Sequence, residues 1–130
     1  MPIRMNATRA YCLSKRKATE DSPDGWSATC TRLNNKIFAI LNHEEGEKAA
    51  ITLKCDPELA LRIREDYPET IIPGYHMNKK HWNTVYIHKD VGQEQINKMI
   101  DWSYDLVLHS FSKKKQQELM DEMQSELNYK

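Results

Sequence analysis

The feature that most constrains the fold is a series of three strand-like segments between Trp26 and Lys54, separated only by short turns. Apolar and hydroxyl-bearing side chains alternate in the first segment, which is the pattern of a half-buried strand. Turns this short hold no crossover helix, so we expect neighbouring strands to pair antiparallel. A fourth strand-like segment follows later in the chain. The predicted strands are 26–33, 36–41, 49–54 and 82–87.

Helices are predicted on both sides of this strand-rich region. The clearest start is Asp56-Pro57, because aspartate is a preferred N-cap and proline suits the first helical position. Consecutive strands combined with helices predict a two-layer α+β domain, in which a mainly antiparallel sheet packs against helices. The predicted helices are 6–13, 57–66, about 91–111 and 113–128, and we expect the last one to fray at its end. The segments 19–25 and 71–81 are expected to be a loop and an irregular region.

Length and composition favour one globular domain. The chain has 130 residues, of which 39% are hydrophobic and 29% charged, and both values are ordinary for a folded domain. Apolar side chains recur at helical spacing in the long predicted helix and define an inward face. The residues that we expect to be largely buried are Phe38, Ile51, Leu53, Leu59, Ile63, Ile100 and Val107.

The sequence also predicts a compartment. No apolar run approaches the ~20 residues that span a bilayer, and no apolar signal region follows Met1. We therefore expect a cytoplasmic protein that makes no membrane contact. The three cysteines form an odd set without a Cys-x-x-Cys pair, which indicates buried thiols in a reducing compartment. A redox or nucleophilic role for one of them stays open.

Charge is segregated along the chain although the formal net charge is +0. Residues 70–89 contain three lysines, three histidines and no acid, with aromatic and amide side chains between them. Lysines can contact phosphates, aromatic rings can stack on bases, and amides can bind base edges or the backbone. These residues, with one lysine from a preceding strand, are the candidate nucleic-acid-binding site. The candidates are Lys54, Tyr75, His76, Asn78, Lys79, Lys80, His81, Trp82 and Asn83.

Structural explanations compete with this interpretation. Trp82 can begin a buried strand and Tyr75 can cover the edge of the core, while a lysine pair on a loop is commonly only solvated. His76 and His81 are five residues apart without an evident third ligand, so we expect no metal and no cofactor. The four glycines form no phosphate-binding loop, and the motifs of common hydrolases are absent. A Cys–His pair stays open, although no spacing in the sequence favours one.

Three stretches resemble the MmcQ/YjbR-like family over residues 5–119. They are L-K-C-D-P-E-L-A at 53–60, I-P-G-Y-H-M-N-K-K-H-W-N-T-V at 72–85, and I-D-W-S-Y-D-L-V at 100–107, followed by the lysines of 113–115. The resemblance implies a single domain over 1–130 with a fold like that of the bacterial frataxin CyaY, and DNA binding through a double-wing arrangement. The loop 18–25 is more polar than the family's pattern. Frataxins bind iron through an acidic first helix, and the acid-free segment 1–19 argues against that role here.

We therefore expect a non-enzymatic DNA-binding protein that acts through the basic and aromatic segment around 73–84, with a monomer favoured. The alternative is a module that binds a protein or a small ligand through the same surface. An enzyme that uses His76, His81 or Cys55 is the third possibility. DNA affinity that depends on phosphate contacts falls steeply as salt rises, which distinguishes the first hypothesis from binding of an uncharged ligand.

Overall fold

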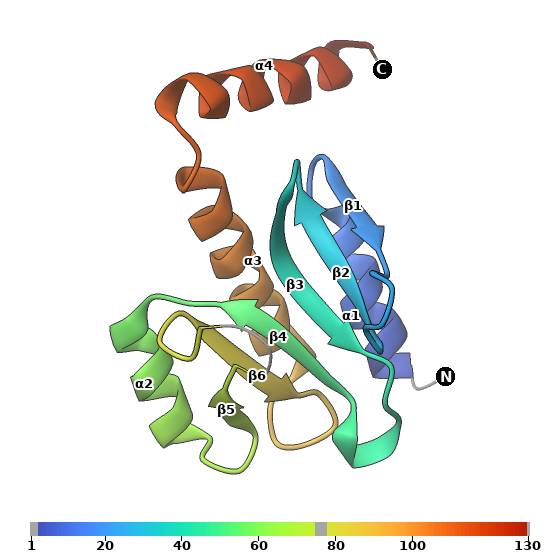
Figure 1. The fold of residues 1–130 in the computed structure, drawn as a ribbon, viewed down its shortest axis with the longest axis vertical. Helices are drawn as coiled ribbons and strands as arrows, with labels where there is room; N and C mark the ends of the chain where they lie inside the picture. The colour runs from blue at the N-terminus through green and yellow to red at the C-terminus, as the bar shows by residue number, and fades with distance from the viewer. Residues whose placement is uncertain (1–2, 75–77, 130) are drawn as a thin grey trace.

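A computed structural model describes residues 3–74 and 78–129, which form six strands, four α-helices and one 3-10 turn (Figure 1). The strands are β1 (Ala18–Asp21), β2 (Ala28–Leu33), β3 (Lys36–Asn42), β4 (Ala50–Lys54), β5 (Ile71–Pro73) and β6 (Trp82–Tyr86). The helices are α1 (Ile3–Ser14), α2 (Pro57–Asp66), α3 (Gln93–His109) and α4 (Lys113–Tyr129), with the 3-10 turn η1 at Gly46–Lys48. The predicted α+β class is confirmed.

The six strands form one sheet in the order β1-β2-β3-β4-β6-β5, and every neighbouring pair is antiparallel. The two edge strands were not predicted, because 18–21 was expected to lie largely in a loop and 71–73 in an irregular region. Both are short, and β1 ends in two acids. Their pairing therefore depends on the edges that β2 and β6 provide, which local sequence does not reveal.

Helices cover one face of the sheet. Figure 1 shows α1 and α3 behind the strands, with α2 beside β5 and β6 at the end of the molecule opposite α4. The predicted core residues on β3, β4 and α3 are buried, as expected. The prediction was wrong for Leu59 and Ile63 on α2, which are only half-buried. This helix packs at the end of the sheet, and its buried side chain is Ala60.

A bulge in β3 ties the sheet to α3. Thr31 pairs with Ala39 and Arg32 with Ile37, so the intervening Phe38 has no partner on β2. The hydroxyl of Ser103 donates a hydrogen bond to the Phe38 carbonyl and accepts one from the Lys54 amide at 2.9 Å. One buried side chain on α3 thus satisfies two backbone groups that the sheet leaves unpaired.

The structure confirms one predicted helix start and corrects two other predicted boundaries. The Asp56 side chain accepts a hydrogen bond from the Leu59 amide at 3.3 Å, which confirms the predicted start of α2. The first helix begins at Ile3, so Asn6 lies inside it and is not its cap. The first predicted strand begins only at Ala28, which leaves Trp26 outside it with 41% of its surface exposed.

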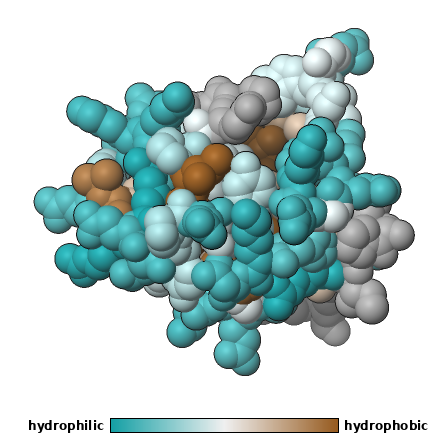
Figure 2. Space-filling model, turned by 90° about the horizontal axis from the view of Figure 1, so that it is seen from below, coloured by the Kyte–Doolittle hydropathy of each residue, from teal (hydrophilic) through white to brown (hydrophobic). Residues whose placement is uncertain are grey.

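The last helix extends from the body of the protein (Figure 1). It is attached through the buried side chains Leu119 and Met123, and through an ion pair at 2.6 Å between Lys17 and Glu122. At the opposite end, the surface is mainly hydrophilic with small, separate hydrophobic patches (Figure 2). Among the helices of the described residues, none has the length and apolar character that a bilayer span requires.

Candidate nucleic-acid interface

The segment Asn78–His81 forms an exposed turn just before β6. The side-chain oxygen of Asn78 accepts a hydrogen bond from the Lys80 amide at 2.8 Å, and its carbonyl accepts one from the His81 amide at 3.2 Å. Both bonds stabilise the turn while the two lysine side chains are exposed to solvent. The candidate residues Tyr75 and His76 lie outside the described residues.

Arg64 on α2 fixes this turn to the body of the protein. Its Nε donates to the side-chain oxygen of Asn83 at 2.6 Å, and its guanidinium also donates to the backbone carbonyls of Lys79 and Trp82. These contacts hold the backbone of the turn against α2. The sequence predictions did not include Arg64, since it is 19 residues from Asn83 and its spacing carries no signal.

Two candidate residues are buried, which corrects the predicted site. Trp82 is 7% exposed and Asn83 is 3% exposed, and the amide of Asn83 contacts Arg64 and the Ala60 carbonyl. Gly74 lies so close that a Cβ added to it would approach the Trp82 Cβ to 2.6 Å. Trp82 and Asn83 therefore position the loop, and their side chains are not part of an exposed contact surface.

Lys54 lies next to the turn. It pairs with Trp82 across β4 and β6, and the following residue, Cys55, donates its amide hydrogen to the His81 carbonyl at 2.7 Å. The described candidates that remain at the surface thus lie together at one end of β4 and β6. They are Lys54, which is half-buried, and the exposed residues Asn78, Lys79, Lys80 and His81. We refer to these five residues as the basic loop surface.

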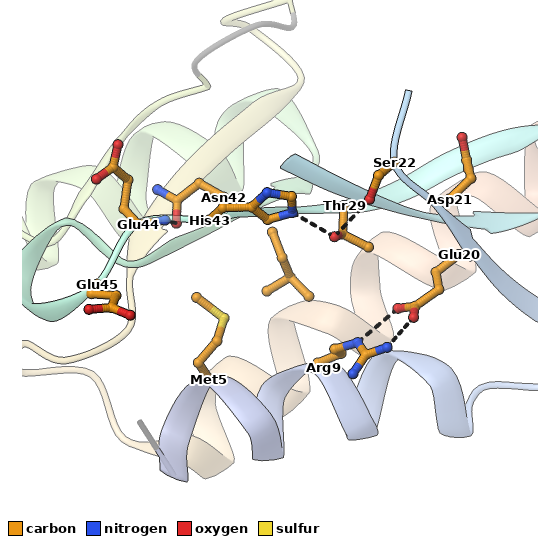
Figure 3. Close-up of a pocket in the computed structure, with 11 residues that line it drawn as sticks. Met5, Arg9, Glu20, Asp21, Ser22, Thr29, Asn42, His43, Glu44 and Glu45 are labelled. Carbon is orange, nitrogen blue, oxygen red and sulfur yellow. Dashed lines mark hydrogen bonds and ion pairs between the residues drawn. The ribbon is translucent and has the colours of Figure 1, made fainter. Parts of the chain in front are cut away.

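A cleft of about 440 Å³ lies elsewhere, between α1 and the ends of β1, β2 and β3 (Figure 3). Arg9 and Glu20 form an ion pair at one end, where Arg9 Nε lies 3.0 Å from Glu20 Oε2. This hydrogen-bonded pair lowers the pKa of Glu20 and raises that of Arg9. Between this ion pair and Glu45, His43 Nε2 lies 2.9 Å from the hydroxyl of Thr29 (Figure 3). The sequence predictions did not identify this cleft, whose lining also includes Asp21, Glu44 and Glu45.

The cysteines are poorly suited to nucleophilic chemistry. Burial raises the pKa of the Cys12 thiol to about 12 and that of Cys55 to about 11, and it also raises the pKa of Cys30. All three thiols are therefore protonated near neutral pH. Within residues 3–74 and 78–129, no three histidine, cysteine or acidic side chains are grouped as metal ligands.

Sequence comparison identifies the family. The YjbR family model matches residues 13–106, within which the basic loop surface lies. This chain belongs to the YjbR family. It is 31% identical over 110 residues to YjbR of Escherichia coli K12, which covers 85% of this chain and 92% of that protein. It is also 38% identical over 61 residues to YyaQ of Bacillus subtilis, which covers 47% of this chain and 50% of that one.

Solved structures support the same YjbR-family fold. The crystal structure of the Deinococcus radiodurans protein DR2400, a DUF419 domain, matches with a TM-score of 0.81 and 28% identity. That match covers 88% of this chain and 86% of the other. A structure from Pseudomonas syringae matches with a TM-score of 0.65 and 29% identity, over 82% of this chain and 99% of that one. These names state a family and a fold, and they assign no ligand.

Proposed function

We propose that this YjbR-family protein is a non-enzymatic nucleic-acid-binding protein whose basic loop surface contacts phosphates. The proposal rests on the arrangement at the turn before β6, where one side chain holds the backbone and others are exposed to solvent. Arg64 holds the backbone carbonyls of the turn, while Lys79 and Lys80 are exposed and Lys54 lies beside them. The surrounding run from Thr70 to Lys89 contains no acid that would repel a phosphate.

Binding of this kind depends on the nucleic-acid backbone. Each lysine that contacts a phosphate releases condensed counterions, so affinity falls steeply as salt rises. The side chains of Trp82 and Asn83 are buried, so the proposal assigns them no base contact. We therefore expect weak sequence preference and strong salt dependence.

The test compares two double variants by fluorescence anisotropy with a labelled DNA duplex at about 50 mM and about 200 mM salt. Lys79→Ala/Lys80→Ala should weaken binding at low salt and reduce the salt slope by about one unit for each lysine. Lys113→Ala/Lys114→Ala removes the same charge from the start of α4, at the opposite end of the molecule (Figure 1). This control should change binding much less.

Thermal melts of both variants should match the wild type, because all four lysines are exposed. Equal titrations for the wild type and Lys79→Ala/Lys80→Ala would remove the basic loop surface from the proposal. A wild type without salt-dependent affinity for any nucleic acid would overturn the function itself.

A groove beside the basic loop surface favours protein or small-ligand binding as the second candidate function. The groove has a volume of about 270 Å³ between the start of α2 and α3, and its lining is largely apolar. Trp102 is 41% exposed there, next to Leu59 and Leu106. Exposed aromatic side chains in apolar grooves are common in protein-binding surfaces. Salt-independent binding that Trp102→Ala abolishes would support this candidate over nucleic acid.

A further inference from the structure

We propose that the sheet face without helices binds single-stranded nucleic acid, with one unstacked base in a hollow over β2, β3, β4 and β6. This inference rests on the proposed function and specifies its ligand. Figure 1 views this face, with α1 and α3 behind the strands. The hollow has a volume of about 410 Å³, within the range of about 300–1,000 Å³ that is usual for ligand sites.

Three buried apolar side chains, two of them alanines, form the floor of the hollow. They are Ala28, Ile40 and Ala50. The hydroxyls of Thr52 and Thr84 lie 2.8 Å apart across β4 and β6, which joins the two strands without adding bulk. The hollow therefore offers both apolar surface and hydroxyl groups. A nucleic-acid base can contact both, because its faces are apolar and its edges are polar.

The walls carry groups that suit a nucleotide. Tyr86 lines one side of the hollow and offers an aromatic ring, and the Nζ of Lys89 lies 5.3 Å from the centre of that ring. Lys48 lines another side and is exposed. Its carbonyl accepts a hydrogen bond from Asn42 at 2.8 Å, which fixes the backbone of this wall. Glu44 is the acid that lines the hollow, and Lys48 balances its charge.

The hollow is continuous with the basic loop surface through the strand register. Lys54 pairs with Trp82, Thr52 with Thr84 and Ala50 with Tyr86, and alternation places these pairs on the same face. Four residues of β4 span ~13 Å from the basic loop surface to the hollow. One strand can therefore contact Lys54 and the basic turn with its phosphates and reach Tyr86 and Lys48 further along.

The recess favours a single strand over a duplex. Paired bases are stacked inside a duplex and expose only their edges in the grooves, so they do not enter a recessed floor. Bases of a single strand can turn outward, stack on an aromatic side chain and bind in a pocket. Stacking tolerates any base, which agrees with the weak sequence preference expected above.

The test measures anisotropy with a labelled oligothymidylate of about twelve nucleotides, a length within the site sizes of single-strand binders. A duplex of the same length is the second probe. The wild type should bind the single strand more tightly than the duplex. Tyr86→Ala should weaken single-strand binding about 10-fold and change duplex binding less than about 2-fold. Tyr86→Phe keeps the ring and should restore single-strand binding.

A lysine pair provides the matched charge control. Lys48→Ala should reduce the salt slope for the single strand by about one unit, whereas Lys98→Ala, exposed on α3 on the other face, should not. Equal affinity for both probes, or Tyr86→Ala with a normal melt and unchanged single-strand affinity, would overturn the inference and leave the proposed function standing. Failure of the wild type to bind either probe would overturn the proposed function, and this inference with it.

Discussion

The basic loop surface and the cleft of Figure 3 carry opposite charges and are held in different ways. In the basic loop surface, Arg64 binds backbone carbonyls and leaves the lysines of the turn exposed. In the cleft, Arg9 binds the carboxylate of Glu20 directly, so each side chain neutralises the other. The comparison shows that an arginine near a surface can either present neighbouring charge or cancel it, depending on the group to which it donates.

Both regions depend on one hydrophobic core, and its centre should give the largest effect on stability. Ile100 on α3 is fully buried, so Ile100→Ala should lower the free energy of unfolding by roughly 2–5 kcal/mol. Ile63 on α2 is only half-buried and lies nearer the basic loop surface, so Ile63→Ala should cost less, below roughly 2 kcal/mol. Denaturant melts measure both values. Equal losses would mean that α2 is as central to the core as α3.

The clamp on the basic loop surface should give the next largest effect. Arg64→Ala removes hydrogen bonds from a charged donor and leaves the buried Asn83 oxygen without this partner, so we expect a loss of ~1.5–3 kcal/mol. Arg64→Lys keeps the charge without the planar fork and should recover little of that loss. Arg62→Ala, an exposed arginine on the same helix, is the matched control. Full recovery with lysine would show that charge alone holds the turn.

Local patterns predicted the parts of the fold that local forces determine. The Asp56-Pro57 cap and the alternating segment that forms β2 carry their signals within a few residues. The strand β1 has no such signal, because it is polar and gains its structure from pairing with β2.

The exposed turn of the candidate site could also be predicted, because its signal is local in the sequence. A basic segment between two structured elements predicts an exposed turn, and Asn78–His81 is one. The burial of Trp82 could not be predicted from the sequence, because it depends on distant segments of the chain. It also gives no sign of Arg64, whose partners are contributed by a turn and strand 15–19 residues away. Whether the surface binds DNA stays a prediction.

The smallest effect should come from the ion pair of the cleft, and it should depend on pH. The hydrogen bonds from Arg9 hold the pKa of Glu20 below its ordinary value of 4.5. The unfolded chain therefore binds a proton at this residue more readily than the folded chain does. It follows that the stabilisation is complete above about pH 4.5 and is lost as the pH falls through the lower pKa of the folded state.

Glu20→Gln removes that titration, so the unfolding free energy of this variant should fall less than that of the wild type between pH 6 and pH 3. The difference should be small, because the Arg9 side chain is 54% exposed and solvent screens the pair. Glu45→Gln is the control, since this exposed carboxylate on the same cleft forms no ion pair with the described residues. Denaturant melts at several pH values compare the two variants with the wild type. If Glu20→Gln and Glu45→Gln change the pH dependence equally, Arg9 does not stabilise the Glu20 carboxylate, and the contrast with the clamped basic loop surface fails at this end of the molecule.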